Sequence, residues 1–112
     1  MQDREIAKQD WPDFFDRVTS ALQGKLVEIE VDSLELGAQI EATRLSLNGL
    51  TYDRKDDSFV VSTDQIEHVI RSPQKIHVAD ATHGVGSLMV TAADGSKQII
   101  RFTEPLALPA AD

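Results

Sequence analysis

The 112-residue chain carries a formal net charge of −8, and 41% of its residues are hydrophobic while 27% are charged. This length and composition fit one folded domain and exclude a disordered chain, which combines few apolar residues with a high net charge. The acidic balance excludes DNA and anionic membranes as expected partners and disfavours RNA, because surfaces rich in phosphate require clustered Lys and Arg side chains.

Cysteine is absent, so disulfides, thiolate metal sites and thiol catalysis are excluded. The first residues lack the apolar run of a secretory signal, and no stretch of about 18 apolar residues is present to span a bilayer. We therefore expect a cytoplasmic protein with a single domain over residues 1–112, in which residues 1–9 and 104–112 are irregular tails.

Residues 10–23 have the clearest helical pattern. Asp10 is a good N-cap, Pro12 falls in the first turn, and Asp13 can complete a capping-box-like pair. Gly24 suits the position that ends the helix. The apolar residues spaced to form one stripe are Trp11, Phe14, Phe15, Val18 and Leu22. We expect this stripe to pack in the core.

Residues 26–32 alternate apolar and acidic side chains, which predicts a half-exposed strand. Gly37 can supply the positive φ of the following turn. A second strand begins at Ala38, and its apolar positions change phase before Leu45, as a β-bulge near Thr43 or Arg44 would cause. The side chains expected to face the core are Val27, Ile29, Val31, Ala38, Ile40 and Ala42.

Residues 48–49, Asn-Gly, fit either a hairpin turn or a bulge, and we favour a bulge in one long bent strand. The hairpin over residues 50–61 is the organising feature of the chain, because apolar and aromatic residues flank a charged turn. Residues 64–70 fit either a strand or a short helical turn. We expect a strand from Lys75 to Ala79 and a flexible loop over residues 80–86.

A second hairpin, with strands 87–92 and 97–102, turns at Asp94-Gly95. Together these elements predict an α+β fold in which one N-terminal helix packs on a bent antiparallel β-sheet or small β-barrel of about six strands.

No stretch carries a motif that would fix a reaction or a cofactor. The spacing of His68, His77 and His83 matches no compact zinc motif. Neither a nucleophile elbow nor a glycine-rich phosphate loop is present. We therefore assign no catalytic residue, metal ligand or cofactor.

The turn of the first hairpin is the candidate binding site: Asp53, Arg54, Lys55, Asp56 and Asp57. Its three carboxylates could bind a hard cation through oxygen. A solvated hairpin tip is the alternative, because Arg54 and Lys55 partly cancel the charge and the Asp-x-Asp-x-Asp-Gly pattern of a calcium loop is missing.

Several short motifs extend over nearly the whole chain. They are Arg4-Glu-Ile6, Trp11-x-x-Phe-Phe-Asp16, Leu36-Gly37, Glu41-Ala42, Gly49-Leu-Thr-Tyr-Asp53, Lys55-Asp-Asp57, Ile66-x-His-x-Ile70 with Pro73, and Ala93-Asp-Gly95 ahead of Ile99-Ile-Arg101. In these motifs the chain resembles a family of small uncharacterised bacterial proteins grouped as a domain of unknown function. The resemblance implies no activity and no catalytic residues.

The order of the helix and first strands is also similar to that of Sm-like small barrels, which often form rings and bind RNA. The hairpin at 87–102 departs from a minimal barrel of that kind. Our leading hypothesis is a non-catalytic protein-interaction or assembly module, with a protein partner or a second copy of itself. The alternatives are a ligand- or cation-binding protein using residues 53–57, a small enzyme with dispersed carboxylates, and an Sm-like RNA-binding barrel.

Overall fold

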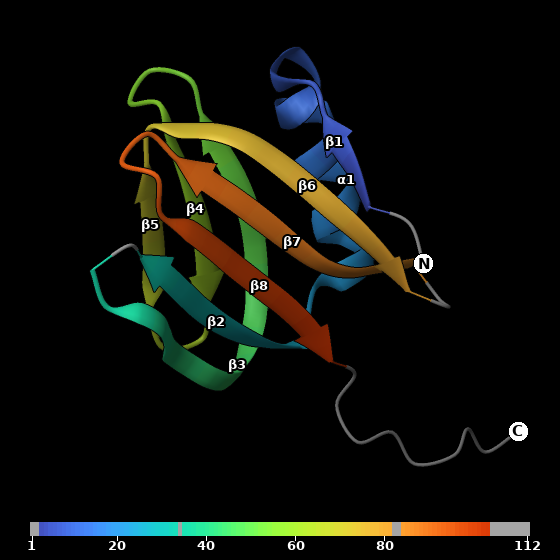
Figure 1. Ribbon diagram of the computed structural model, residues 1–112. Coiled ribbons are helices and arrows are strands. Elements are labelled where there is room, and N and C mark those ends of the chain that lie inside the picture. Colours follow the sequence, from blue (N-terminus) through green and yellow to red (C-terminus); the bar gives the residue numbers. More distant parts are fainter. Residues whose placement is uncertain (1–2, 34, 82–83, 104–112) are drawn as a thin grey trace, which may run out of the picture.

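The computed structural model describes residues 3–33, 35–81 and 84–103. Within these ranges, eight strands form one antiparallel sheet in the order β1-β6-β7-β8-β2-β3-β4-β5 (Figure 1). In chain order the elements are β1 (Asp3–Ile6), the 3-10 helix η1 (Lys8–Asp10), α1 (Trp11–Leu22), β2 (Leu26–Ser33), β3 (Gly37–Asp53), β4 (Ser58–Thr63), β5 (Glu67–Arg71), β6 (Pro73–Ala81), β7 (Gly84–Ala92) and β8 (Lys97–Thr103).

The α+β class is confirmed, but the expected number of about six strands is wrong, and the sheet is open instead of closed into a barrel. β1 and η1 occupy residues where the sequence predicts an irregular segment. β1 has a single apolar residue, Ile6, so no alternating pattern marks it. Its pairing with β6, in which Ile6 lies opposite Ile76, makes it a strand.

The structure decides two segments that the sequence predicts as a loop or leaves ambiguous. β6 and β7 extend into the expected loop at residues 80–86, so most of that loop is strand, and residues 82–83 lie outside the described part of the chain. The ambiguous segment at 64–70 ends in β5, not in a helical turn. The expected tail at 104–112 also lies outside the described residues.

The predicted helix is confirmed within one residue at each end. Its five-residue apolar stripe is buried throughout, and Gly24 follows with a φ of +88°. Asp10 is at the N-cap, but η1 runs directly into α1, so Asp10 already has helical backbone angles and its side chain makes no capping hydrogen bond within the described chain. The helix start therefore depends on Pro12 and on packing more than on the predicted capping pair.

β3 is one long bent strand, as predicted, and it bends at bulges. Arg44 has a φ of +58°, which confirms the bulge expected there, and the register also shifts at Asn48. A further shift was not predicted: Glu30 pairs with Ile40, whereas Ile29 pairs with Ala42. The extra residue between them turns Ile40 to the outer face, where it is 54% exposed, so its predicted inward position is wrong.

Ala38 is also exposed, so its predicted inward position is wrong as well, and Val31, likewise predicted to face the core, is only half-buried. Val27 and Ile29 are buried as expected.

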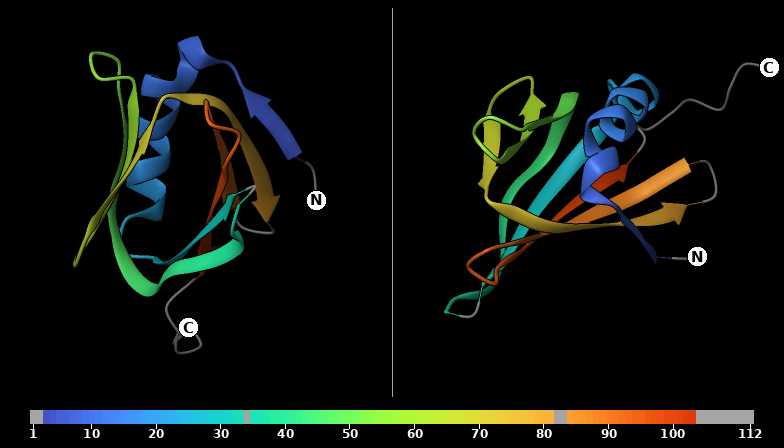
Figure 2. Two further views of the ribbon diagram at one scale, coloured as in Figure 1. Left: turned by 60° about the vertical axis from the view of Figure 1, so that its left-hand side comes forward. Right: turned by 90° about the horizontal axis from the view of Figure 1, so that it is seen from above.

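The sheet coils, and α1 lies across its concave side (Figure 2). At the centre of this core the rings of Phe15 and Phe59 are 4.8 Å apart.

The helix also covers part of a sheet edge. β2 pairs with β3 only as far as Ser46. The second half of β3 therefore has β4 on one side and, in the part of the chain that the structure describes, no strand on the other. Thr19 of α1 fills that side: its hydroxyl accepts a hydrogen bond from the N–H of Leu50 at 3.0 Å and donates to the C=O of Leu50 at 3.1 Å. The Gln23 amide donates to the C=O of Asn48 at 3.1 Å. Helix side chains thus replace a strand partner over this stretch.

Candidate binding site at the tip of the first hairpin

The turn between β3 and β4 is held by its own residues. One carboxylate oxygen of Asp53 accepts hydrogen bonds from the backbone N–H of Lys55 at 2.9 Å and of Asp56 at 3.4 Å. Asp57 closes the turn with a φ of +49°, and its C=O accepts a bond from Ser72 N–H at 2.8 Å. Asp tolerates this left-handed conformation better than most residues. The carboxylate of Asp53 is therefore used in building the turn.

Asp57 contacts different groups. Its carboxylate accepts a hydrogen bond from the Tyr52 hydroxyl at 2.6 Å and lies 3.3 Å from the ammonium of Lys8. The hydrogen bond from Tyr52, with a smaller contribution from Lys8, lowers the pKa of Asp57 below its ordinary value of 3.8. Burial, and then the hydrogen bond to Asp57, raise the pKa of Tyr52. The hairpin tip is thereby joined to η1.

Trp11 forms the base of this cluster. Its ring meets Tyr52 edge to face at 4.9 Å, and its indole N–H donates to the C=O of Ile6 at 2.8 Å. The Lys8 ammonium lies 5.4 Å from the Trp11 ring centre and 5.8 Å from that of Tyr52. One residue of the helix thus joins β1, η1 and the hairpin tip.

Changing Tyr52 to Phe tests this cluster by its pH dependence. Because the pKa of Asp57 is lowered in the folded state, the hydrogen bond stabilises the fold above the unfolded pKa and is lost as the pH falls through the folded pKa. We therefore expect Tyr52→Phe to be destabilising at pH 7 and its effect to shrink steadily in acid, below about pH 4. Urea unfolding of both proteins across this range measures the difference. An effect of the same size at all pH values would contradict the assignment.

Beyond Thr19 the edge of β3 is open. Antiparallel pairing alternates hydrogen-bonded and non-hydrogen-bonded residues, and the backbone groups of Leu50 face Thr19, away from β4. The N–H and C=O of Tyr52, two residues further along, therefore face the same way. Among the described residues, no helix side chain or strand bonds to them. Tyr52 thus presents one free backbone donor and one free acceptor.

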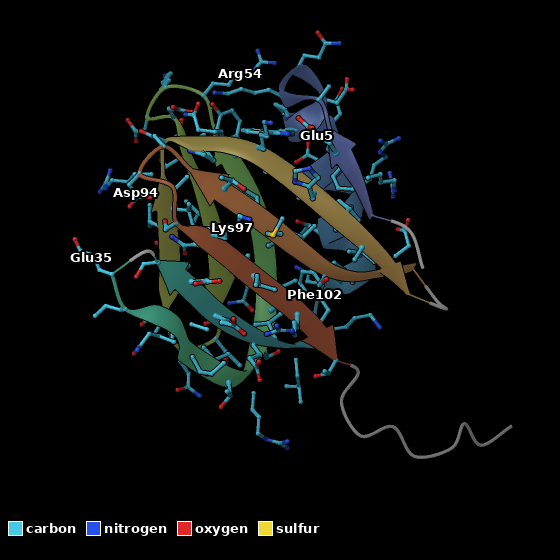
Figure 3. All side chains as sticks on the ribbon, viewed as in Figure 1. Glu5, Glu35, Arg54, Asp94, Lys97 and Phe102 are labelled. Carbon is cyan, nitrogen blue, oxygen red and sulfur yellow. The ribbon has the colours of Figure 1, made fainter. Side chains whose placement is uncertain are left out.

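These groups lie beside an open hollow of about 690 Å³. It is lined by Pro12, Thr51, Tyr52, Asp53, Arg54 and Lys55. Figure 3 places Arg54 at the end of the molecule where the hairpin tip lies near the start of the helical segment. The hollow offers an apolar wall, two cationic side chains and the carboxylate of Asp53 around an unpaired strand edge.

The structure therefore divides the five predicted site residues. Asp53, Arg54 and Lys55 line the hollow together, whereas Asp57 is not among its lining residues and is engaged by Tyr52 and Lys8. Asp56 lines no part of the hollow. The sequence could have indicated Tyr52, which adjoins the charged turn. It gave no signal for Lys8 or Pro12, which reach the tip only through the fold.

The described residues contain no group of three His, Asp or Glu side chains placed to hold a metal ion. His68 hydrogen-bonds to Gln98, and His77 lies 3.8 Å from Glu5, while His83 is outside the described residues. With the carboxylates of Asp53 and Asp57 engaged by separate partners, the geometry gives the cation-binding alternative no specific support.

A second hollow, of about 740 Å³, lies between β1 and α1. Arg4, one of its lining residues, makes two hydrogen bonds to Asp80 at 3.1 and 3.2 Å and lies 5.7 Å from the centre of the Phe14 ring. The hydrogen bond between them raises the pKa of Arg4 and lowers that of Asp80. This pair ties β6 to β1 and packs on the helix, which explains both residues structurally.

Comparison with known proteins supports the resemblance noted in the sequence. The model of a family of unknown function, DUF5335, matches residues 2–111. The chain belongs to this family. An uncharacterised protein of Aquifex aeolicus (strain VF5) is 31% identical over 110 residues, covering 97% of this chain and 99% of the relative. No solved structure matches the chain.

Membership in a small uncharacterised family, expected from the sequence, is thus confirmed. The family description names no activity, so the geometry alone bears on function. Among the described residues of this DUF5335 member, no helix is long and apolar enough to cross a membrane.

Proposed function

We propose that this protein is a non-catalytic protein-interaction module that binds an extended segment of a partner at the Tyr52 edge of β3. The observation that carries the proposal is the free N–H and C=O of Tyr52 beside the hollow, where the cover supplied by Thr19 ends. An extended peptide can satisfy both groups by pairing with the edge, as in β-strand addition.

The surroundings of Tyr52 favour one kind of segment. Pro12 and the Tyr52 ring supply apolar surface, and the two positive charges of Arg54 and Lys55 outweigh the single negative charge of Asp53. An extended segment with an acidic residue next to an apolar one would match both features. The Tyr52–Asp57 hydrogen bond and the Trp11 contact keep the edge in place before binding, which reduces the entropy cost of association.

A selection from a library of short random peptides tests the proposal. We expect the selected peptides to share an acidic residue and to bind with micromolar affinity, measured by fluorescence polarisation. Lys55→Glu should weaken this binding roughly fivefold or more, since it reverses the charge beside the bound acid. Lys97→Glu, the same change on the exposed start of β8, should leave the affinity unchanged.

In a titration followed by amide chemical shifts, the Tyr52 N–H should move among the most. Peptides that bind with equal affinity to the wild type and to Lys55→Glu, or that move amides elsewhere, would reject the site. A selection that enriches nothing above bare support would reject peptide binding itself.

A further inference from the structure

β5 is one of the two end strands of the open sheet, the other being β1. It pairs with β4 on one side, and within the described residues no strand pairs with it on the other. Figure 2 shows it at the rim of the coiled sheet. Val69, at its centre, is 41% exposed, and Ile66, just before it, is 42% exposed. An exposed edge with apolar side chains is a template for another strand.

The hydrogen bonds at its two ends show which backbone groups face outward. Thr63 N–H bonds to Ile66 C=O at 2.9 Å, and Ser72 N–H bonds to Asp57 C=O at 2.8 Å. Pairs along an antiparallel ladder alternate between bonded and non-bonded. Applying this alternation inward from the bonded pair at either end gives the same result: His68 and Ile70 are the residues of β5 that hydrogen-bond to β4. The residues of β5 whose N–H and C=O groups point to the open side are therefore Glu67, Val69 and Arg71.

These three residues also share the outer face of the sheet, and their order is self-complementary. A two-fold antiparallel pairing centred on Val69 places Val69 opposite its own copy. The same register places Glu67 opposite Arg71 of the second copy, and Arg71 opposite Glu67. Opposite charges facing each other across strands stabilise the pair, whereas like charges there destabilise it.

We propose that β5 pairs with β5 of a second copy of this chain, joining two sheets into one continuous sheet across a two-fold axis. This surface is separate from the Tyr52 edge, so the proposal does not depend on the proposed function. Charged residues at an edge ordinarily discourage pairing. Here their signs and their equal spacing on either side of Val69 favour one partner in one register.

The pairing would leave few edge groups of β5 unsatisfied. The outward N–H and C=O groups of all three residues would bond across the axis. The outer row of Thr51, Val60 and Val69, which are aligned across β3, β4 and β5, would continue into the same row of the second copy. Because a five-residue strand buries little area, we expect a dimer with a Kd on the order of 10–100 µM.

Sedimentation of the full chain over a range of concentrations tests the proposal, with a monomer mass of 12.3 kDa as the reference. The wild type should approach twice this mass as its concentration rises. Glu67→Arg and Arg71→Glu should each dimerise at least roughly tenfold more weakly, because each places like charges opposite each other at both ends. Mixed in equal amounts, the two variants should associate, since every opposing pair is then of opposite sign.

Val69→Pro provides a test of the backbone. In the wild type the N–H of Val69 faces the open side. Proline at this position therefore removes no hydrogen bond to β4 but removes the central hydrogen bond to the second copy. We expect it to be monomeric, and far-ultraviolet circular dichroism shows whether it folds. If it does not, the charge variants still decide. A wild type that remains monomeric at millimolar concentration, or two charge variants that fail to associate when mixed, would overturn the proposal.

Discussion

Replacing Trp11 by alanine is expected to lower the free energy of unfolding by about 3–5 kcal/mol, the usual cost of removing a large buried aromatic side chain. Trp11 is 1% exposed, and its indole N–H donates to the C=O of Ile6. The substitution also removes the edge-to-face contact with Tyr52. Urea unfolding followed by circular dichroism at pH 7 measures the loss.

Trp11→Phe is the matched control. It keeps an aromatic ring in the core but leaves the C=O of Ile6 without its donor, so we expect a smaller loss of about 1–3 kcal/mol. If the alanine variant were no less stable than the phenylalanine variant, Trp11 would not anchor the core as described. Intact stability in both variants would show that β1 and the hairpin tip are held by other contacts.

Replacing Thr19 by valine should cost about 2 kcal/mol, although valine has nearly the same shape. The Thr19 hydroxyl both accepts from the N–H and donates to the C=O of Leu50. Valine leaves these two groups unpaired on a part-buried edge, where water replaces the lost bonds incompletely. Equilibrium unfolding measures the loss, and hydrogen exchange of the Leu50 amide should become faster, because its acceptor is removed.

Thr19→Ser keeps the hydroxyl and removes the Thr19 methyl group. This methyl group faces Gly49, and a Cβ atom added to Gly49 would lie 3.5 Å from it. We expect serine to retain the slow exchange of the Leu50 amide. Valine and serine variants with the same exchange rate would show that the hydroxyl does not cover the edge of β3.

The Thr19 prediction and the two interaction proposals concern the same physical problem, the unpaired edges of an open sheet. Thr19 covers β3 at Leu50, whereas Tyr52, two residues beyond, and β5 have no such cover among the described residues. Since uncovered edges attract other strands, these are the places where a partner segment or a second copy would bind.

The candidate site could be predicted only in part. The charged turn and the neighbouring Tyr52 are adjacent in sequence, so turn chemistry indicated residues 53–57 as a place to look. Sequence could not show that Asp53 bonds to its own turn while Asp57 bonds to Lys8, because both are aspartates in one short segment. The direction of each carboxylate depends on the backbone angles of the folded turn and on the position of η1.

By itself the sequence determined the elements whose signals are local. The apolar stripe of α1, the turn at Asp94-Gly95 and the bulge at Arg44 follow from periodicity and turn chemistry within a few residues. Only the tertiary structure decided that the sheet has eight strands, that β1 pairs with β6, and which edges remain open. The physical reason is that backbone N–H and C=O groups are the same in every residue except proline, so long-range pairing leaves little trace in the sequence.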